Sequence, residues 1–78
     1  MWWFLKKIRD DDIVSYQYGA ATKVLSGQID FDKRTKEFNV VKVADNDTMK
    51  AVSRFLLEHI YHIIVHENCP SERQIAIG

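Results

Sequence analysis

The stretch of sequence that decides the fold is residues 45–70, DNDTMKAVSRFLLEHIYHIIVHENCP. Its large apolar side chains recur every three or four residues, which is the spacing of one face of an α-helix; they are Met49, Val52, Leu56, Ile60 and Ile63. The polar run DNDT at 45–48 is typical of a helix start, because its short side chains can accept hydrogen bonds from free backbone amides. Asn68 can adopt the left-handed conformation that ends a helix, and Pro70 cannot continue one. The pattern predicts one helix of roughly 30 Å that ends at about His66 and buries Ile60 and Ile63 against a sheet.

Five short segments of apolar or alternating sequence flank this helix, four before it and one after it. Such segments are typical of β-strands, and the predicted strands are residues 2–8, 13–19, 28–32, 38–43 and 73–77. The polar runs DDD at 10–12 and KRTK at 33–36 predict the turns of two hairpins. The apolar parity changes between Val40 and Val41, which predicts either a β-bulge near Val40 or a strand that is apolar on both faces.

The chain is therefore predicted to be an α+β protein with the element order β-β-β-β-α-β. We expect a mainly antiparallel, twisted sheet of four or five strands with one long helix packed on one face. Its 78 residues are enough for one domain, so residues 1–78 are expected to form a single α+β unit. The N-terminal strand is expected at an edge of the sheet, near a contact with a partner. In the alternative arrangement it is central, pairs with both the second and the last strand and has both faces covered.

Charge and hydropathy argue against several classes of partner. Eleven basic residues balance eleven acidic ones, whereas nucleic-acid binders usually carry a basic excess, so no nucleic acid is expected. No stretch approaches the roughly 20 apolar residues of a membrane span, so no membrane association is expected. The apolar N-terminus lacks the preceding positive charges of a signal peptide, and Cys69 is the single cysteine, so a cytoplasmic protein is expected.

Three histidines on the predicted helix are the strongest candidates for chemistry. His62 and His66 are four residues apart, a separation that lets two imidazoles share a metal ion. His59 lies about 10 Å from His66 along the helix axis, so a third ligand would come from elsewhere, with Cys69 the nearest candidate. The alternative interpretation is that all three are structural residues at the core boundary. Because the chain has no phosphate-binding loop, nucleophile elbow or paired-cysteine zinc motif, we expect no cofactor and no catalytic residue.

Aromatic side chains on the first two strands are the candidate partner-binding residues: Trp2, Trp3, Phe4, Tyr16 and Tyr18. Adjacent residues of a strand point to opposite faces, so one tryptophan can enter the core while the other faces away. Alternatively, the sheet curls and buries both. Since one helix is about 10–12 Å across and five strands span roughly 24 Å, we expect apolar surface to remain for an interface.

These patterns favour a small non-catalytic protein-binding domain that acts through a sheet face or edge. Bacterial inhibitors of the immunity-protein type belong to this class and are similar in size. One alternative is a small metal-binding or acid–base enzyme that uses His62 and His66. Another is a structural subunit of a homo- or hetero-oligomer, including a homodimer.

Overall fold

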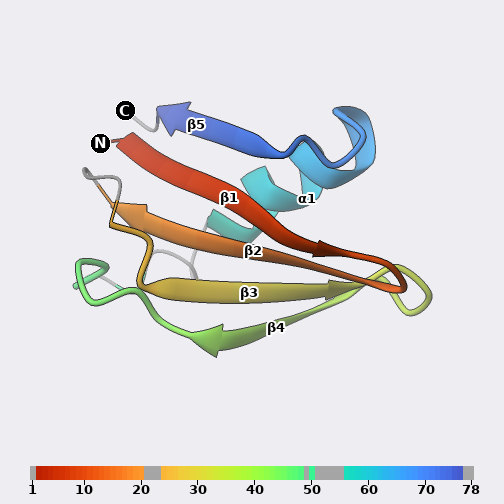
Figure 1. Ribbon diagram of the computed structural model, residues 1–78, viewed down its shortest axis with the longest axis horizontal. Helices are drawn as coiled ribbons and strands as arrows, with labels where there is room; N and C mark the ends of the chain where they lie inside the picture. The colour runs from red at the N-terminus through yellow and green to blue at the C-terminus, as the bar shows by residue number, and fades with distance from the viewer. Residues whose placement is uncertain (1, 21–23, 49, 51–55, 77–78) are drawn as a thin grey trace.

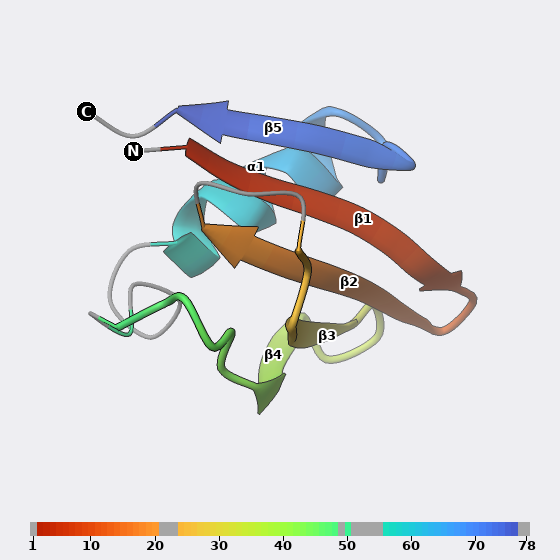
Figure 2. The same ribbon diagram turned by 60° about the vertical axis from the view of Figure 1, so that its left-hand side comes forward.

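Five strands and one helix make up the computed structural model, which describes residues 2–20, 24–48, 50 and 56–76. The elements are β1 (Trp2–Asp10), β2 (Ile13–Ala20), β3 (Gly27–Asp32), β4 (Glu37–Lys42), α1 (Leu57–His66) and β5 (Glu72–Ala76). The strands form one sheet in the order β4-β3-β2-β1-β5, and every neighbouring pair is antiparallel. α1 lies behind this sheet (Figure 1) and packs on one of its faces (Figure 2). The α+β fold and its element order are therefore confirmed.

Aspartate side chains close the two predicted hairpins. In the first turn, Asp11 Oδ1 accepts a hydrogen bond from the backbone amide of Ile13 at 2.9 Å. In the second, Asp32 Oδ1 accepts one from the amide of Arg34 at 2.8 Å, and Lys36 adopts a φ of 61°. Such bonds to an amide two residues ahead are the reason that aspartate favours turns.

The core lies between α1 and one face of the sheet. Its buried apolar residues come from the covered face of four strands, from the helix and from the segment before it: Trp3, Leu5, Val14, Tyr16, Tyr18, Ala20, Ile29, Phe31, Ala44, Leu56, Ile60, Ile63, Ile64 and Ile75. The predicted burial of Ile60 and Ile63 is confirmed, while Met49 and Val52 of the predicted stripe lie outside the described residues.

Tyr61 extends the reach of the helix across the sheet. Its ring packs edge-on against Phe31 of β3, with ring centroids 5.9 Å apart, and against Phe38 of β4 at 6.3 Å. One narrow helix thereby covers part of the far strands, and Phe38 is only half-buried.

β1 lies inside the sheet rather than at its edge. Leu5 pairs with Tyr18 of β2 on one side and with Arg73 of β5 on the other. The expectation of an N-terminal edge strand is therefore wrong. The central alternative is correct in its pairing but not in covering both faces of the strand, since 52% of Trp2 is exposed. The physical reason for the central position is that α1 returns the chain to the start of the sheet, where β5 pairs with the free side of β1.

The two adjacent tryptophans point to opposite faces of β1. Trp3 is buried in the core with 2% of its surface exposed, whereas 52% of Trp2 is exposed. The alternative in which a curled sheet buries both is wrong, because α1 covers only one face.

A β-bulge interrupts the pairing of β3 and β4, which is the first of the two arrangements that the change of apolar parity predicts. Ile29 pairs with Val40 and Gln28 pairs with Lys42, so Val41 is the extra residue. Val41 is half-exposed as a result.

The polar run at 45–48 does not start the helix directly, which corrects the sequence-based prediction. Lys50 has a φ of 52°, outside the helical range. The Asn46 amide accepts a bond from Ala20 N at 3.1 Å and donates one to Ala20 O at 2.6 Å, while Asp47 accepts one from Tyr18. These short side chains thus bind groups near the end of β2. At the other end of α1 the prediction is confirmed, since Asn68 is left-handed with a φ of 58°.

Candidate partner-binding surface

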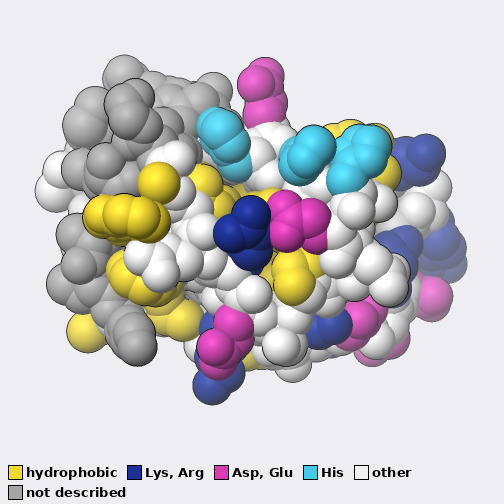
Figure 3. Space-filling view, turned by 90° about the horizontal axis from the view of Figure 1, so that it is seen from above, with side chains coloured by type: hydrophobic (Ala, Val, Ile, Leu, Met, Phe, Trp, Pro, Cys, Tyr) yellow, Lys and Arg dark blue, Asp and Glu magenta, His cyan; other side chains and the backbone are white. Residues whose placement is uncertain are grey.

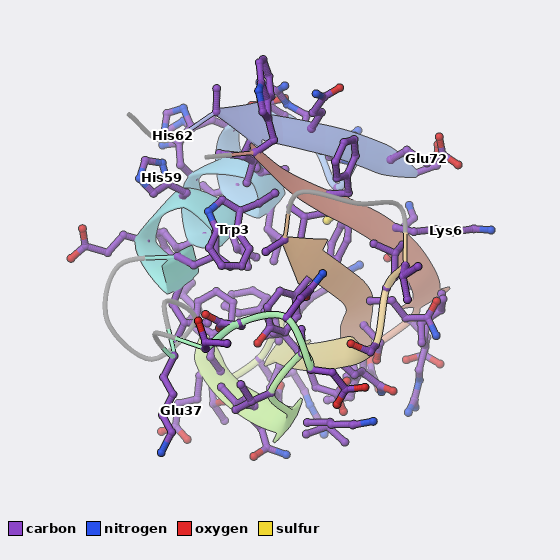
Figure 4. The ribbon with its side chains drawn as sticks, turned by 90° about the vertical axis from the view of Figure 1, so that its left-hand side faces the viewer. Trp3, Lys6, Glu37, His59, His62 and Glu72 are labelled. Atoms are coloured by element: carbon purple, nitrogen blue, oxygen red, sulfur yellow. The ribbon has the colours of Figure 1, made fainter. Side chains whose placement is uncertain are left out.

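The face of the sheet opposite α1 is the open face. Strand alternation places Trp2, Phe4 and Lys6 on this side of β1, where they pair with Ala76, Gln74 and Glu72 of β5. Figure 4 shows Trp3 directed toward α1, and Lys6 and Glu72 directed away from it. Among the described residues only α1 is helical, so this face has no helical cover.

Residues 24–26 lie across the open face above Gly19. A Cβ atom at Gly19 would collide with the carbonyl oxygen of Val24 and lie 3.4 Å from the Cα atom of Leu25. Glycine is therefore required there because another part of the backbone approaches closely. The result is that Leu25 is held beside β1, since Gly19 pairs with Phe4.

A hollow of about 390 Å³ opens between this segment and strands β1 and β5. We call it the β1–β5 hollow, and its lining residues are Phe4, Leu5, Lys6, Leu25, Glu72, Arg73 and Gln74. Phe4 and Leu25 contribute apolar surface, and Lys6 and Glu72 bring opposite charges. This volume lies at the low end of the range for small-molecule pockets, so it suits one or two side chains of a partner.

Exposed apolar side chains accompany this hollow. Trp2 is two residues from Phe4 on the same face and is 52% exposed. Val24 belongs to the segment that crosses the face and is 69% exposed. One side of the molecule thus carries four apolar side chains that are exposed or half-buried: Trp2, Phe4, Val24 and Leu25.

Three of the five predicted partner-binding side chains lie in the core instead. Trp3, Tyr16 and Tyr18 are at most 2% exposed. Only Trp2 and Phe4 remain on the open face, so the candidate set reduces to these two. Strand alternation alone separates the two groups, but it does not say which face is covered.

The two buried tyrosines connect the sheet to distant loops. Tyr18 Oη accepts a hydrogen bond from the amide of Ala44 at 2.9 Å and donates one to Asp47 at 3.1 Å. Burial raises the pKa of Tyr18 to about 12. Tyr16 donates to the carbonyl of Pro70 at 2.6 Å, and burial likewise raises its pKa. These hydroxyl groups therefore act as neutral donors in the structure.

The sequence did not indicate part of this surface. That part consists of Val24, Leu25 and the β5 residues of the hollow. Residues 20–25 have no clear period, so the sequence predicts at most an extension of the second strand past Gly19 and no covering segment. The signal that could have indicated a close approach is Gly19, an isolated glycine within a strand pattern.

The three histidines, all on α1, lie in a row on the surface seen in Figure 3. His62 and His66 are neighbours with ring centroids 4.6 Å apart. Cys69, the third ligand considered from the sequence, is half-buried, and its thiol sulfur lies 3.7 Å from the carbonyl oxygen of Ile64. Within the part of the chain that the structure describes, no group of three or more His, Cys, Asp or Glu could hold a metal ion.

Two of the three aspartates at the first hairpin form ion pairs with basic side chains. Asp10 forms ion pairs with Lys33 at 2.7 Å and with Lys7 at 2.8 Å, and their hydrogen bonds lower the pKa of Asp10 to about 2. Arg9 pairs with Asp11 at 2.9 Å. These contacts are those of a charged turn that stabilises the hairpin.

Comparison with protein-family models, with curated proteins and with solved structures finds no match to this chain. Over the described residues, no helix has the length and apolar character needed to cross a membrane. Any functional assignment must therefore rest on the geometry of the surface.

Proposed function

We propose that this chain is a non-catalytic protein-binding domain whose open sheet face receives a partner protein at the β1–β5 hollow. The observation that carries the proposal is that Trp2, half-exposed, stands on the open face two residues from Phe4 in that hollow. A cytoplasmic inhibitor of the immunity-protein type is the biological role that fits this mode of action.

Tryptophan is the residue type most often found to dominate the binding energy of protein interfaces. Such residues contribute most where neighbouring apolar contacts and a polar rim exclude water. Phe4 and Leu25 supply the apolar contacts here, and Lys6 with Glu72 supply charges of both signs at the rim. This mixed charge, like the zero net charge, supports a protein partner rather than a nucleic acid.

The free edge of β5 determines the form of partner that fits best. β5 is the last strand of the sheet order, and its pairing with β1 has no register shift. The opposite edge strand, β4, contains the bulge at Val41, which disfavours regular pairing. An extended partner segment that pairs with β5 and places one apolar side chain in the adjacent hollow satisfies both features.

The test compares Trp2→Ala with Val65→Ala. Val65 is 49% exposed on α1, away from the open face, so it is a matched control for the loss of exposed apolar surface. Proteins captured by the immobilised wild-type chain from its host should be lost with Trp2→Ala and retained with Val65→Ala. Calorimetry with the identified partner should show a loss of about 2 kcal/mol for Trp2→Ala, or about thirtyfold in Kd. Unchanged affinity of a folded Trp2→Ala variant would refute the proposal.

A second candidate function is a subunit that pairs with its own copy. The regular outer edge of β5, with which no described strand pairs, favours it. In that case two β5 strands would pair antiparallel across a two-fold axis. Sedimentation over a hundredfold range of concentration should then show a dimer, and Gln74→Pro should convert it to a monomer because proline removes a strand hydrogen bond. A monomer at every concentration would leave only the heteromeric form of the proposal.

A further inference from the structure

We propose that His62 and His66 form a two-histidine binding site for a divalent transition-metal ion of the zinc class on the exposed edge of α1. This site does not depend on the protein-binding function, since it uses neither the open face nor the β1–β5 hollow. It also assigns a chemical role to the two side chains that the fold leaves at the surface.

The distance between the two imidazole rings is the distance that chelation requires. Zinc binds histidine nitrogen at about 2.0–2.1 Å, which places each ring centroid about 3.2 Å from the metal. For a nitrogen–metal–nitrogen angle of about 90–110°, the two centroids then lie about 4.5–5.2 Å apart. The observed separation is 4.6 Å. The two ring planes are tilted by 36° to each other.

Both imidazoles are exposed to solvent and form no polar contact with a described residue. His62 and His66 are exposed, and within the described part of the chain neither ring forms a hydrogen bond or an ion pair. No hydrogen bond or ion pair to a described residue therefore has to be broken when a metal binds.

The backbone between the two histidines is held by the core. Ile63 and Ile64 lie between them in sequence and are 4% and 7% exposed. A helical turn that is anchored in this way fixes the separation of the two imidazole Cβ atoms, so little further ordering is needed when a metal binds. The first turn of the helix carries the control residue. His59 projects from the same side of α1 as His62 (Figure 4) but is not a ring neighbour of either member of the pair.

Neighbouring charged groups do not complete the site. Glu67 follows His66 but is engaged by Arg73, with Nε and Oε1 2.8 Å apart. Cys69 is half-buried near Ile64. The protein therefore supplies two ligands, and water or a group from another molecule supplies the remaining two of a tetrahedral zinc site. Zinc, nickel and copper ions fit imidazole ligands, whereas magnesium prefers oxygen.

The experiment measures thermal unfolding of the full chain with zinc chloride and, separately, with magnesium chloride. Zinc should raise Tm by several degrees, because it binds the folded state, and magnesium should not. The substitutions His62→Ala and His66→Ala should each weaken zinc binding at least about tenfold, since each removes one of two ligands. His59→Ala should bind zinc as the wild type does.

Imidazole NMR spectra provide the second measurement, which does not depend on changes in stability. Zinc should shift the ring resonances of His62 and His66 together, at one equivalent of metal per chain, and leave those of His59 in place. The proposal is overturned if zinc does not shift the resonances of this pair. It is also overturned if His59→Ala abolishes the Tm increase or if His62→Ala leaves it intact.

Discussion

The two faces of the sheet differ in burial: one packs against α1 and the other is largely open. Adjacent residues of one strand show this difference most clearly. Tyr18 points under α1, is completely buried and binds Asp47, while Gly19 points to the open face and lies beneath Val24. Trp3 and Trp2 repeat the contrast on β1. Covered by a helix, one face carries the large side chains of the core; the other, covered only in part by a loop, keeps exposed apolar residues. Strand alternation creates both faces, but the packing partner determines which one stabilises the fold.

The largest expected effect is on the covered face, at Ile63. Replacing Ile63 by Ala removes a side chain that is 4% exposed and leaves a cavity between α1 and the sheet, so the free energy of unfolding should fall by about 2–5 kcal/mol. Chemical denaturation measures this loss. Val65→Ala on the outer side of the same helix should change stability by less than about 0.5 kcal/mol. Similar losses at both positions would contradict the assignment of the helix face.

A smaller effect is expected on the open face, at Gly19. Alanine at this position would place its Cβ against the backbone carbonyl of Val24, so residues 24–26 must move, at a cost of about 1–3 kcal/mol. Hydrogen exchange should show faster exchange for the amides of residues 24–26 in the variant than in the wild type. Gln17→Ala, on the same face and half-buried, is the control and should be close to neutral. A stable Gly19→Ala variant with unchanged exchange would mean that this segment does not rest on the sheet.

The smallest effect is expected at Asp10, in the exposed turn at the end of both faces. Hydrogen bonds from Lys33 and Lys7 hold the pKa of Asp10 at about 2, below its ordinary value of 3.8. A lowered pKa in the folded state stabilises the protein above about pH 4, and this contribution disappears as the pH falls toward 2. Asp10→Asn should therefore be slightly less stable than the wild type at neutral pH. Its difference from the wild type should shrink as the pH falls from 4 and disappear below about pH 2, as measured by urea denaturation across this range. A difference that persists below about pH 2 would show that another contact of Asp10 matters more.

Local periodicity was sufficient to predict most of the architecture. The strands, both hairpin turns, the bulge near Val40 and the left-handed Asn68 all follow from short stretches of sequence, because turn chemistry and side-chain alternation act over a few residues. The apolar period of α1 likewise identified Ile60 and Ile63 as core residues.

The candidate surface was predicted less completely for a definite physical reason. Trp2 and Phe4 could be named from sequence as partner-binding residues because large aromatic side chains are common in interfaces. Trp3, Tyr16 and Tyr18 have the same chemistry, and only the position of α1 separates them from the first two. Leu25 became part of the hollow because the backbone crosses Gly19, which no local pattern indicates.

By itself, the sequence determined which residues share a strand face, where the chain turns and which side of the helix is apolar, since all of these depend on neighbours within a few positions. The tertiary structure alone decided that β1 is central, that Asn46 and Asp47 bind the end of β2, and that one sheet face is covered while the other remains open. These outcomes depend on contacts between residues far apart in the chain, such as Tyr18 with Asp47. Several partners with suitable chemistry compete for such contacts, and only the packing of the whole chain selects among them.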